Sequence, residues 1–200
     1  MRFGKHRNKI FVYLASRSPR RREILREMGI AFKLVPSRYI EAPKRGLSAS
    51  KLVLKHAIGK VRLAVIPTRK GIVLGADTVI CCSNRILGKP QTMREAIRML
   101  TLLSGRAHIV YTGVALFNLE TGKLLAGFSK TKVYFNKLTR DAILNYLKKI
   151  HPFDKAGSYA IQQGNKIVRK VEGSYSNVLG LPKELISIFL REINKPERKK

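Results

Sequence analysis

The amino-acid sequence predicts an α/β fold, in which a mixed β-sheet is flanked by helices and two lobes surround a cleft. Three observations lead to this prediction. Short apolar runs rich in β-branched residues alternate with amphipathic helical segments in the first half of the chain. Pairs of segments typical of hairpins follow in the second half. A length of 200 residues with 44% hydrophobic residues is enough for one cored domain, and no linker divides it.

The first half of the chain alternates strands with helices. Ser18 followed by Pro19 is a typical helix start, and Gly29 is suited to the helix end. The predicted elements are a strand over 10–14, a helix over 19–28, a strand over 31–35, a loop over 38–47, a helix from Ser48 to about residue 65, and a buried strand over 71–76 that ends at Asp77.

The second half predicts paired strands and three further helices. Thr92 and Glu95 have the spacing of a capping box, and Thr139 caps a later helix. The predicted elements are a hairpin of 78–82 with 85–87 around Ser83-Asn84, a helix to Leu103, strands over 108–117 and 124–135, a helix to Ile150, a hairpin of 159–162 with 167–172 around Gly164-Asn165, and a helix over 183–193.

Three arginines, Arg20, Arg21 and Arg22, occupy the first turn of the helix that begins at Pro19. A helix N-terminus already carries partial positive charge and free N–H donors, so cations there are unfavourable unless an anion docks. Phosphate is the usual guest of such a site. The alternative is an exposed basic turn without a ligand.

Only twelve carboxylates accompany 41 lysines and arginines, so each carboxylate can be considered separately. Helix faces, a capping box, a surface turn and the C-terminal tail account for eight of them. The remaining four are Glu41, Asp77, Asp154 and Glu172. Asp77 is the strongest candidate, because carboxyl ends of buried strands carry ligand-binding groups in α/β sheets. A carboxylate there can bind a cation or activate water, or it can simply cap its own loop.

Other candidate residues are weaker when taken alone. Lys89 lies on a constrained loop between Gly88 and Pro90 and could hold phosphate, but a single lysine is more often solvated. The Gln162 amide could read a nucleobase edge, although an exposed hairpin turn explains it equally. His56 on an apolar helix face is more typical of a core histidine. The sequence has neither a P-loop motif nor a Gly-x-Gly-x-x-Gly dinucleotide loop.

The formal net charge of +29 attracts anions and has three possible explanations: nucleic-acid binding, a phosphate-bearing small substrate, or a generally basic proteome. Zinc-finger, helix-turn-helix and aromatic RNA-binding signatures are missing, so specific nucleic-acid binding is not expected. The adjacent Cys81 and Cys82 give no disulfide framework. No apolar run reaches the roughly 18 residues that cross a bilayer, and the N-terminus does not resemble a signal peptide. We therefore expect a cytoplasmic protein that does not contact membranes.

Seven segments together resemble the Maf family of nucleoside triphosphate pyrophosphatases. They occur in the family's order and cover the chain from about residue 10 to 193. The segments are LASRSPRRREIL at 14–25, GADTV at 75–79, LGKP at 87–90, LSGR at 103–106, HIVYTGV at 108–114, DKAGSYAIQ at 154–162, and EGSYSNVLGLP at 172–182. We therefore expect a basic extension over 1–9, a single Maf-like catalytic domain over 10–193 and a basic tail over 194–200.

The resemblance implies an elongated α/β structure similar to that of the inosine triphosphate pyrophosphatases. It implies cleavage of a nucleoside triphosphate between the α and β phosphates with a divalent metal, Mg²⁺ or Mn²⁺. The sequence is similar to the branch that prefers dTTP and UTP, rather than to the branch that prefers 7-methyl-GTP. A homodimer is possible by the same resemblance.

The resemblance also implies roles for individual residues. Asp77 matches the proton acceptor, and Asp77 and Glu41 are the expected metal ligands. The expected substrate-binding residues are Ser16, Arg20, Arg21, Glu41, Lys60, Thr78, Lys89 and Gln162. Among them Arg20, Thr78 and Gln162 match positions that set substrate preference. Two alternatives to the enzyme remain: a basic nucleic-acid-binding protein, and a sensor that binds nucleotides without hydrolysing them.

Overall fold

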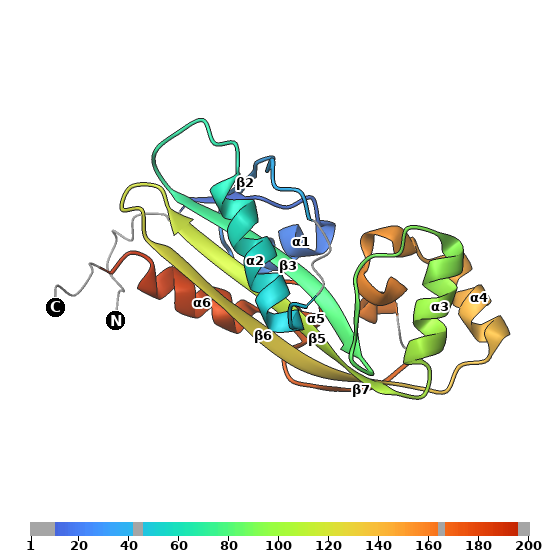
Figure 1. Cartoon of the computed structure of the whole chain (residues 1–200). Helices are drawn as coiled ribbons and strands as arrows, with labels where there is room; N and C mark the ends of the chain where they lie inside the picture. Colours follow the sequence, from blue (N-terminus) through green and yellow to red (C-terminus); the bar gives the residue numbers. More distant parts are fainter. Residues whose placement is uncertain (1–10, 42–45, 164–166, 196–200) are drawn as a thin grey trace.

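A twisted mixed sheet forms the frame of the molecule (Figure 1). The computed structural model describes residues 11–41, 46–163 and 167–195, and within them the sheet has seven strands. Six strands follow the order β2-β1-β3-β5-β6-β7, and β4 pairs with β3. Their bounds are β1 Val12–Leu14, β2 Phe32–Leu34, β3 Ile72–Cys82, β4 Arg85–Leu87, β5 Ala107–Asn118, β6 Leu124–Phe135 and β7 Val168–Glu172. Strand β1 is parallel to β2 and β3, and the other pairs are antiparallel.

Helices cover both faces of this sheet, as the alternation of side chains along the strands requires. The helices are α1 Pro19–Glu27, α2 Ala49–Arg62, α3 Met93–Leu103, α4 Arg140–Lys149, α5 Tyr175–Val178 and α6 Lys183–Glu192. On β3, Ile72 and Leu74 pack in a cluster with residues of α1 and α6, while Val73 packs with Ala57 and Val61 of α2. Helix α2 therefore lies on the sheet face opposite α1 and α6 (Figure 1).

Three long strands join two lobes. At one end of β3, β5 and β6 lie α1, α2 and α6, and at the other end lie α3 and α4 (Figure 1). A separate apolar cluster fills the second lobe, where Ile80, Val110 and Val133 of the long strands meet α3 and α4. Each lobe thus has a core of its own, and the strands run continuously between the two.

The edge of β3 is open in its middle. Strand β1 pairs with Ile72–Leu74, and β4 pairs with Ile80–Cys82. Between these two partners, residues 75–79 have a strand neighbour only on the β5 side among the described elements. This gap places Asp77 at the junction of the two lobes.

Two expectations from the sequence are wrong. The strand that we expected to end at Asp77 continues to Cys82, because β5 pairs with it from Ile72 to Cys81 without interruption. Asp77 therefore lies in the middle of a strand rather than at its carboxyl end.

The hairpin expected from 159–162 and 167–172 does not form either. Residues Ile161–Gln163 make a 3₁₀ turn, and β7 pairs with β6 instead. Tyr159 and Ile161 are drawn into the core of the second lobe, and the Tyr146 hydroxyl engages both the N–H and the C=O of Ala160. Those contacts use backbone groups that a hairpin would need. The turn residues Gly164 and Asn165 lie outside the described residues.

The bounds of the other predicted helices and strands are confirmed within one to three residues where the structure describes them, whereas residue 10 of the first strand and residues 42–45 of the predicted loop lie outside the described residues. Ser48, Thr92 and Thr139 accept backbone N–H groups at the starts of α2, α3 and α4. Ser83 and Asn84 both have positive φ, as a tight hairpin turn requires. Within the described residues, no helix is both long and apolar enough to cross a membrane.

Candidate functional site

A cleft of about 580 Å³ opens at the gap in the edge of β3. Its walls come from both lobes: the start of α1 and the loop before it, Glu41, Lys60 of α2, Lys89, and the short 3₁₀ turns η1 (Pro152–Asp154), η2 (Ala156–Ser158) and η3 (Ile161–Gln163). The cleft lies between elements far apart in sequence, which the three continuous strands connect.

Lys60 lies between two carboxylates at the floor of the cleft. Its Nζ is 2.6 Å from Oε1 of Glu41 and 2.9 Å from Oδ1 of Asp77, and it also donates to the carbonyl oxygen of Ala76 at 3.0 Å. Lys60 and Asp77 are both buried, with 8% exposure each. An ammonium that is so buried requires these acceptors, because burying an unpaired charge is strongly unfavourable.

Glu41 is ionised in this arrangement. Partial burial opposes its negative charge, but the neighbouring Lys60 ammonium outweighs that effect, assisted by Lys89. As a result the pKa of Glu41 lies below its ordinary value. The cleft floor therefore carries carboxylate oxygens and an ammonium together.

Glu41, His56 and Asp77 form a group that could hold a metal ion, since one ligand atom of each lies within 4.8 Å of the others. His56 is buried, and its Nδ1 has no hydrogen-bond partner within the described part of the chain. The donor set of two carboxylates and an imidazole is compatible with a divalent cation that shares further ligands with a substrate.

Arg21 links the two faces of the cleft at the first turn of α1. Its guanidinium donates to the Gly180 carbonyl oxygen at 2.8 Å, the Ser16 hydroxyl at 3.0 Å and the Thr78 hydroxyl at 3.2 Å. Burial lowers the pKa of Arg21, and the carboxylates of Asp77 and Glu41 counteract that effect. Because a guanidinium is not deprotonated in proteins, Arg21 stays charged near neutral pH. These fixed contacts orient a buried cation beside the cleft.

Thr78 continues this polar network through the sheet. Its hydroxyl meets the Thr112 hydroxyl at 3.1 Å, and Thr112 donates to the Asn177 carbonyl oxygen at 2.9 Å. Asn177 is completely buried at the start of the segment that leads to Gly180. The network therefore anchors α5 and the Gly180 loop against the strand that carries Asp77.

Arg20 reaches across the mouth of the cleft to the second lobe. It donates to Oδ2 of Asp154 at 3.3 Å and to the Asp154 backbone oxygen at 3.2 Å. The Lys155 ammonium lies 2.5 Å from the other carboxylate oxygen. Partial burial opposes the charge of Asp154, but Lys155 outweighs it and lowers the pKa. One carboxylate thus holds two cations of the cleft.

The start of α1, from Ser18 to Arg21, forms part of the cleft wall. The Ser18 side chain makes no capping bond, and the Ser18 N–H donates to the Ser16 hydroxyl at 3.2 Å. Because Ser16 also accepts from Arg21, the loop and the first turn form one polar unit. Such a helix start is suited to an anion.

The structure brings eight of the nine residues predicted for the site into the cleft lining: Ser16, Arg20, Arg21, Glu41, Lys60, Asp77, Thr78 and Lys89. Gln162 is exposed and is not among the described lining residues, so its role stays a prediction. His56 is buried, as expected of a core histidine, but it also lies beside Glu41 and Asp77, which the sequence did not indicate, and Lys155 was not singled out. His56 could have been found from its spacing of one helical turn from Lys60, whereas Lys155 offered only its position beside Asp154.

The second-lobe side of the cleft is largely apolar. Ile80, Val110, Tyr159, Ile161, Val178 and Leu179 line it. A flat apolar group fits against such a wall, while anionic groups fit against the arginines and lysines of the other side. The cleft is therefore suited to a small ligand with one apolar end and one multiply anionic end.

Comparison with known proteins identifies the group to which this chain belongs. The family model described as Maf-like protein matches residues 11–193, so the chain belongs to the Maf family. A protein of Moorella thermoacetica named dTTP/UTP pyrophosphatase is 44% identical over 181 residues, which cover 88% of this chain and 93% of the relative. A protein of Citrifermentans bemidjiense with the same name is 45% identical, with 86% and 89% coverage. One of Methanosarcina barkeri, also so named, is 39% identical, with 86% and 88% coverage.

Proposed function

We propose that this protein is a nucleoside triphosphate pyrophosphatase that hydrolyses dTTP and UTP to the monophosphate and pyrophosphate. The observation that carries the proposal is the position of Asp77 on the open edge of β3, facing Lys60 and lying in the same cleft as Arg20 and Arg21. The printed names of the Maf relatives support the substrate assignment.

The triphosphate binds along the cationic wall. Arg20 and Arg21 project from the start of α1, and a planar guanidinium can contact two phosphate oxygens at once. Lys89 supplies a point charge from the other side, and Ser16 offers a hydroxyl. Because Arg20 is held by Asp154, a phosphate must compete with that carboxylate when the substrate enters.

Asp77 orients and deprotonates the water that attacks the α-phosphorus. In that attack a water oxygen bonds to phosphorus, the bond to the bridging oxygen breaks, and pyrophosphate leaves. Lys60 fixes the carboxylate by its contact at 2.9 Å, which leaves the other oxygen of Asp77 for the water or for a metal ion that holds the water. General-base assistance of this kind typically gives a factor of about 10²–10⁴ in rate.

Glu41, Asp77 and His56 are the residues that would hold Mg²⁺ or Mn²⁺. The buried His56 Nδ1 without a partner and the half-exposed Glu41 carboxylate support this assignment. Such an ion would neutralise phosphate charge and polarise the reacting phosphorus centre when bound.

The base lies against the apolar wall of the second lobe. Thr78 is at the boundary between the two walls, and its hydroxyl is already oriented by Arg21 and Thr112. We expect Thr78, with the Arg20 position and Gln162, to favour a pyrimidine with a 4-keto group. Gln162 is exposed and lies outside the cleft lining, so its contact with the base stays a prediction.

The test is pyrophosphate release from a panel of normal and modified triphosphates with Mg²⁺ and Mn²⁺, in the absence of any polymer. We expect dTTP and UTP to be the preferred substrates. Asp77→Asn keeps the shape but loses the base, and kcat should fall by a factor of about 10²–10⁴.

Asp141→Asn is the matched control, because it makes the same chemical change at an exposed position in the first turn of α4. Its turnover should be unchanged. Near wild-type turnover of Asp77→Asn would contradict the role of Asp77. Binding of dTTP without any pyrophosphate release by the wild-type protein would instead favour the nucleotide sensor.

A further inference from the structure

The outward face of β6 combines aromatic and cationic side chains. Phe128, Lys130, Lys132 and Tyr134 alternate with Ser129, Thr131, Val133 and Phe135 along this strand. Thr131, Val133 and Phe135 are buried with at most 2% exposure. The first four side chains therefore share the opposite face of the strand. We call these four residues, with Arg169 and Lys170 of the adjacent β7, the β6 outer face.

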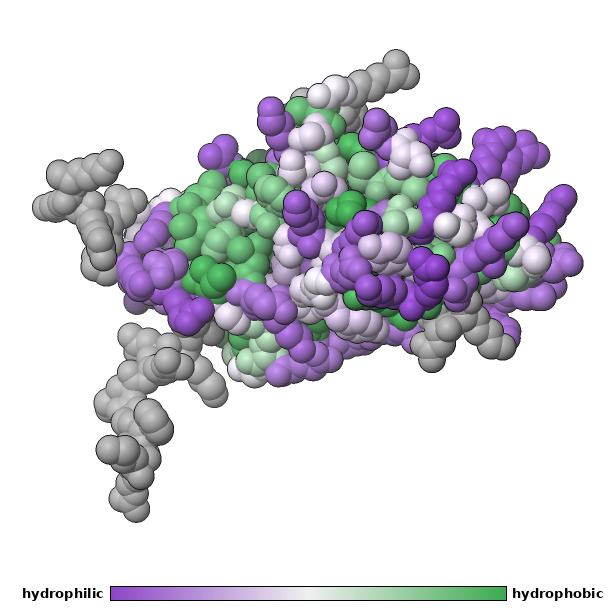
Figure 2. Space-filling model, turned by 90° about the horizontal axis from the view of Figure 1, so that it is seen from below, coloured by the Kyte–Doolittle hydropathy of each residue, from purple (hydrophilic) through white to green (hydrophobic). Residues whose placement is uncertain are grey.

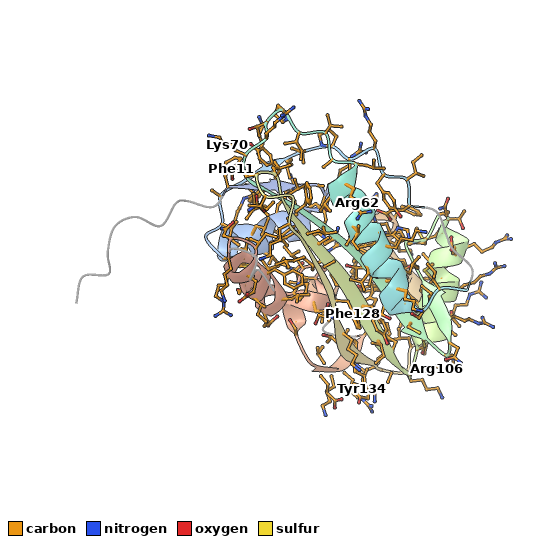
Figure 3. The ribbon with its side chains drawn as sticks, turned by 60° about the vertical axis from the view of Figure 1, so that its left-hand side comes forward. Phe11, Arg62, Lys70, Arg106, Phe128 and Tyr134 are labelled. Atoms are coloured by element: carbon orange, nitrogen blue, oxygen red, sulfur yellow. The ribbon has the colours of Figure 1, made fainter. Side chains whose placement is uncertain are left out.

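The cations of this face surround an aromatic ring. The Lys132 ammonium lies 5.0 Å from the centre of the Tyr134 ring, the Arg169 guanidinium 5.7 Å and the Lys170 ammonium 5.9 Å. Phe128, 43% exposed, lies 6.1 Å from the ring of Tyr111 on β5. Figure 3 shows Phe128 and Tyr134 in succession along the long strands, toward Arg106 at the far tip.

The charge of the face is strongly positive. Lys130, Lys132, Arg169 and Lys170 are exposed. One carboxylate, Glu172, lies among the described neighbours, where it accepts from the Tyr134 hydroxyl and pairs with Lys170. Hydrophilic side chains are prominent in the middle of the view from below, where Figure 1 places β6 and β7 (Figure 2). The exposed Phe128 ring and the half-buried Tyr134 ring therefore lie among charged side chains.

Helix α2 separates this face from the cleft. Asp77, Gly113 and Phe128 lie in register on three neighbouring strands. A Cβ on Gly113 would overlap the α2 backbone at Val53, so α2 rests directly on the middle position. Asp77 is therefore on one side of the helix and Phe128 on the other. A ligand of the β6 outer face does not enter the catalytic cleft.

We propose that the β6 outer face binds single-stranded nucleic acid. Proteins that hold single strands combine a cationic track for the backbone with aromatic rings on which bases stack, and this face has both on one strand. From Phe128 to Tyr134 it extends about 20 Å, at about 3.3 Å per residue. That length accommodates a segment of a few nucleotides. The basic groups contact phosphates, and Phe128 and Tyr134 stack with bases without strong sequence preference.

The proposal is tested by fluorescence anisotropy, which measures the binding of labelled oligo-dT and oligo-U of about 20 nucleotides and of a DNA duplex of the same length. We expect the single strands to bind more tightly than the duplex. Binding should persist in excess of a dTTP analogue with nitrogen between the α and β phosphates. Tighter duplex binding, or displacement by the analogue, would overturn the proposal.

Two variants separate stacking from charge. Phe128→Ala with Tyr134→Ala should weaken single-strand binding by about 5- to 150-fold for each stacked base. Lys130→Gln with Lys132→Gln should reduce the slope of log K against log salt by about 1.4, at about 0.7 for each single-strand phosphate contact. Lys148→Gln with Lys149→Gln removes the same charge from the exposed end of α4 and is the matched control.

All three variants should release pyrophosphate from dTTP at wild-type rates, which separates this proposal from the proposed enzyme. Thermal unfolding verifies that each variant is folded, and the lysine pair probes the face even if the aromatic pair proves unstable. If the Lys130/Lys132 and Lys148/Lys149 variants lose affinity for single strands equally, the binding comes from general charge attraction, and the proposal is overturned. A dimer in sedimentation that the aromatic variant dissociates, without single-strand binding, would assign the face to self-association instead.

Discussion

Gly75 lies on the α2 side of β3, two residues before Asp77, and it allows the helix to approach the sheet closely. A Cβ at this position would lie 2.8 Å from the Ala57 carbonyl oxygen, 2.9 Å from Cγ1 of Val61 and 3.1 Å from Cβ of Lys60. The substitution Gly75→Ala therefore pushes on the turn of α2 that presents Lys60. Because the obstacle is helix backbone, a side-chain rotation cannot relieve it.

The size of the effect follows from these distances. Non-bonded carbon contacts are favourable near 3.5–4.0 Å, so α2 must retreat by about 0.7 Å. Overpacking of this kind costs about 1–3 kcal/mol of folding free energy. The Lys60 ammonium would retreat with the helix and lengthen its contacts of 2.9 Å to Asp77 and 2.6 Å to Glu41. A misplacement near 1 Å can cost about 10² in rate.

Urea unfolding and pyrophosphate release from dTTP measure the two effects. Gly88→Ala is the control, because nothing lies within 4 Å of a Cβ there and its φ is ordinary. We expect Gly75→Ala to lose both stability and turnover while Gly88→Ala loses neither. If Gly75→Ala unfolds at the wild-type urea midpoint and keeps wild-type kcat, the close approach of α2 does not position Lys60.

Three further predictions test other parts of the cleft. Arg21→Lys keeps the charge but cannot make three fixed contacts, so unfolding in urea should show a loss of about 1–3 kcal/mol; unchanged stability would contradict the buried network. Asp154→Asn frees Arg20 for phosphate, so the KM for dTTP should fall with less than about 1 kcal/mol change in stability, whereas a raised KM would show that Asp154 is needed to position Arg20. His108 is buried against Tyr159, and burial lowers its pKa to about 4. Between pH 6.5 and 4 the imidazole of His108 is protonated in the unfolded chain but not in the folded protein. The free energy of unfolding should therefore fall by about 3 kcal/mol as the pH is lowered through this range. His108→Gln keeps an amide that can hydrogen-bond to Tyr159 but does not titrate, so the unfolding free energy of this variant should lack the pH-dependent loss.

Local signals in the sequence predicted most of the fold. Caps such as Ser48 and Thr139 use hydrogen bonds between near neighbours, and the Ser83-Asn84 turn depends on two positive φ angles. Each of these features depends on only a few neighbouring residues, so it can be predicted from a single sequence. The long-range pairing was less accessible. The residues near Asp77 do not show that pairing with β5 extends β3 beyond Asp77. Those near Tyr159 do not show that this segment packs in the core of the second lobe instead of forming a hairpin.

The candidate site shows the same division between local and long-range information. The arginines of α1 were evident because they conflict with the dipole of their own helix. Lys60 was placed only at the edge of an apolar stripe, and its burial becomes understandable only beside Glu41 and Asp77, which come from other elements. The hydrogen bond from Arg21 to Gly180 joins residues 159 positions apart, so it could be predicted only by resemblance to a family.

The strands that run without interruption between the two lobes also determine how the lobes can move. They are joined by strands of 11 and 12 residues rather than by a flexible connector. Opening the cleft therefore means changing the twist of a continuous ribbon, a deformation spread over many hydrogen bonds. The two lobes can therefore move by a small change of twist that is distributed along the three strands, without a hinge residue.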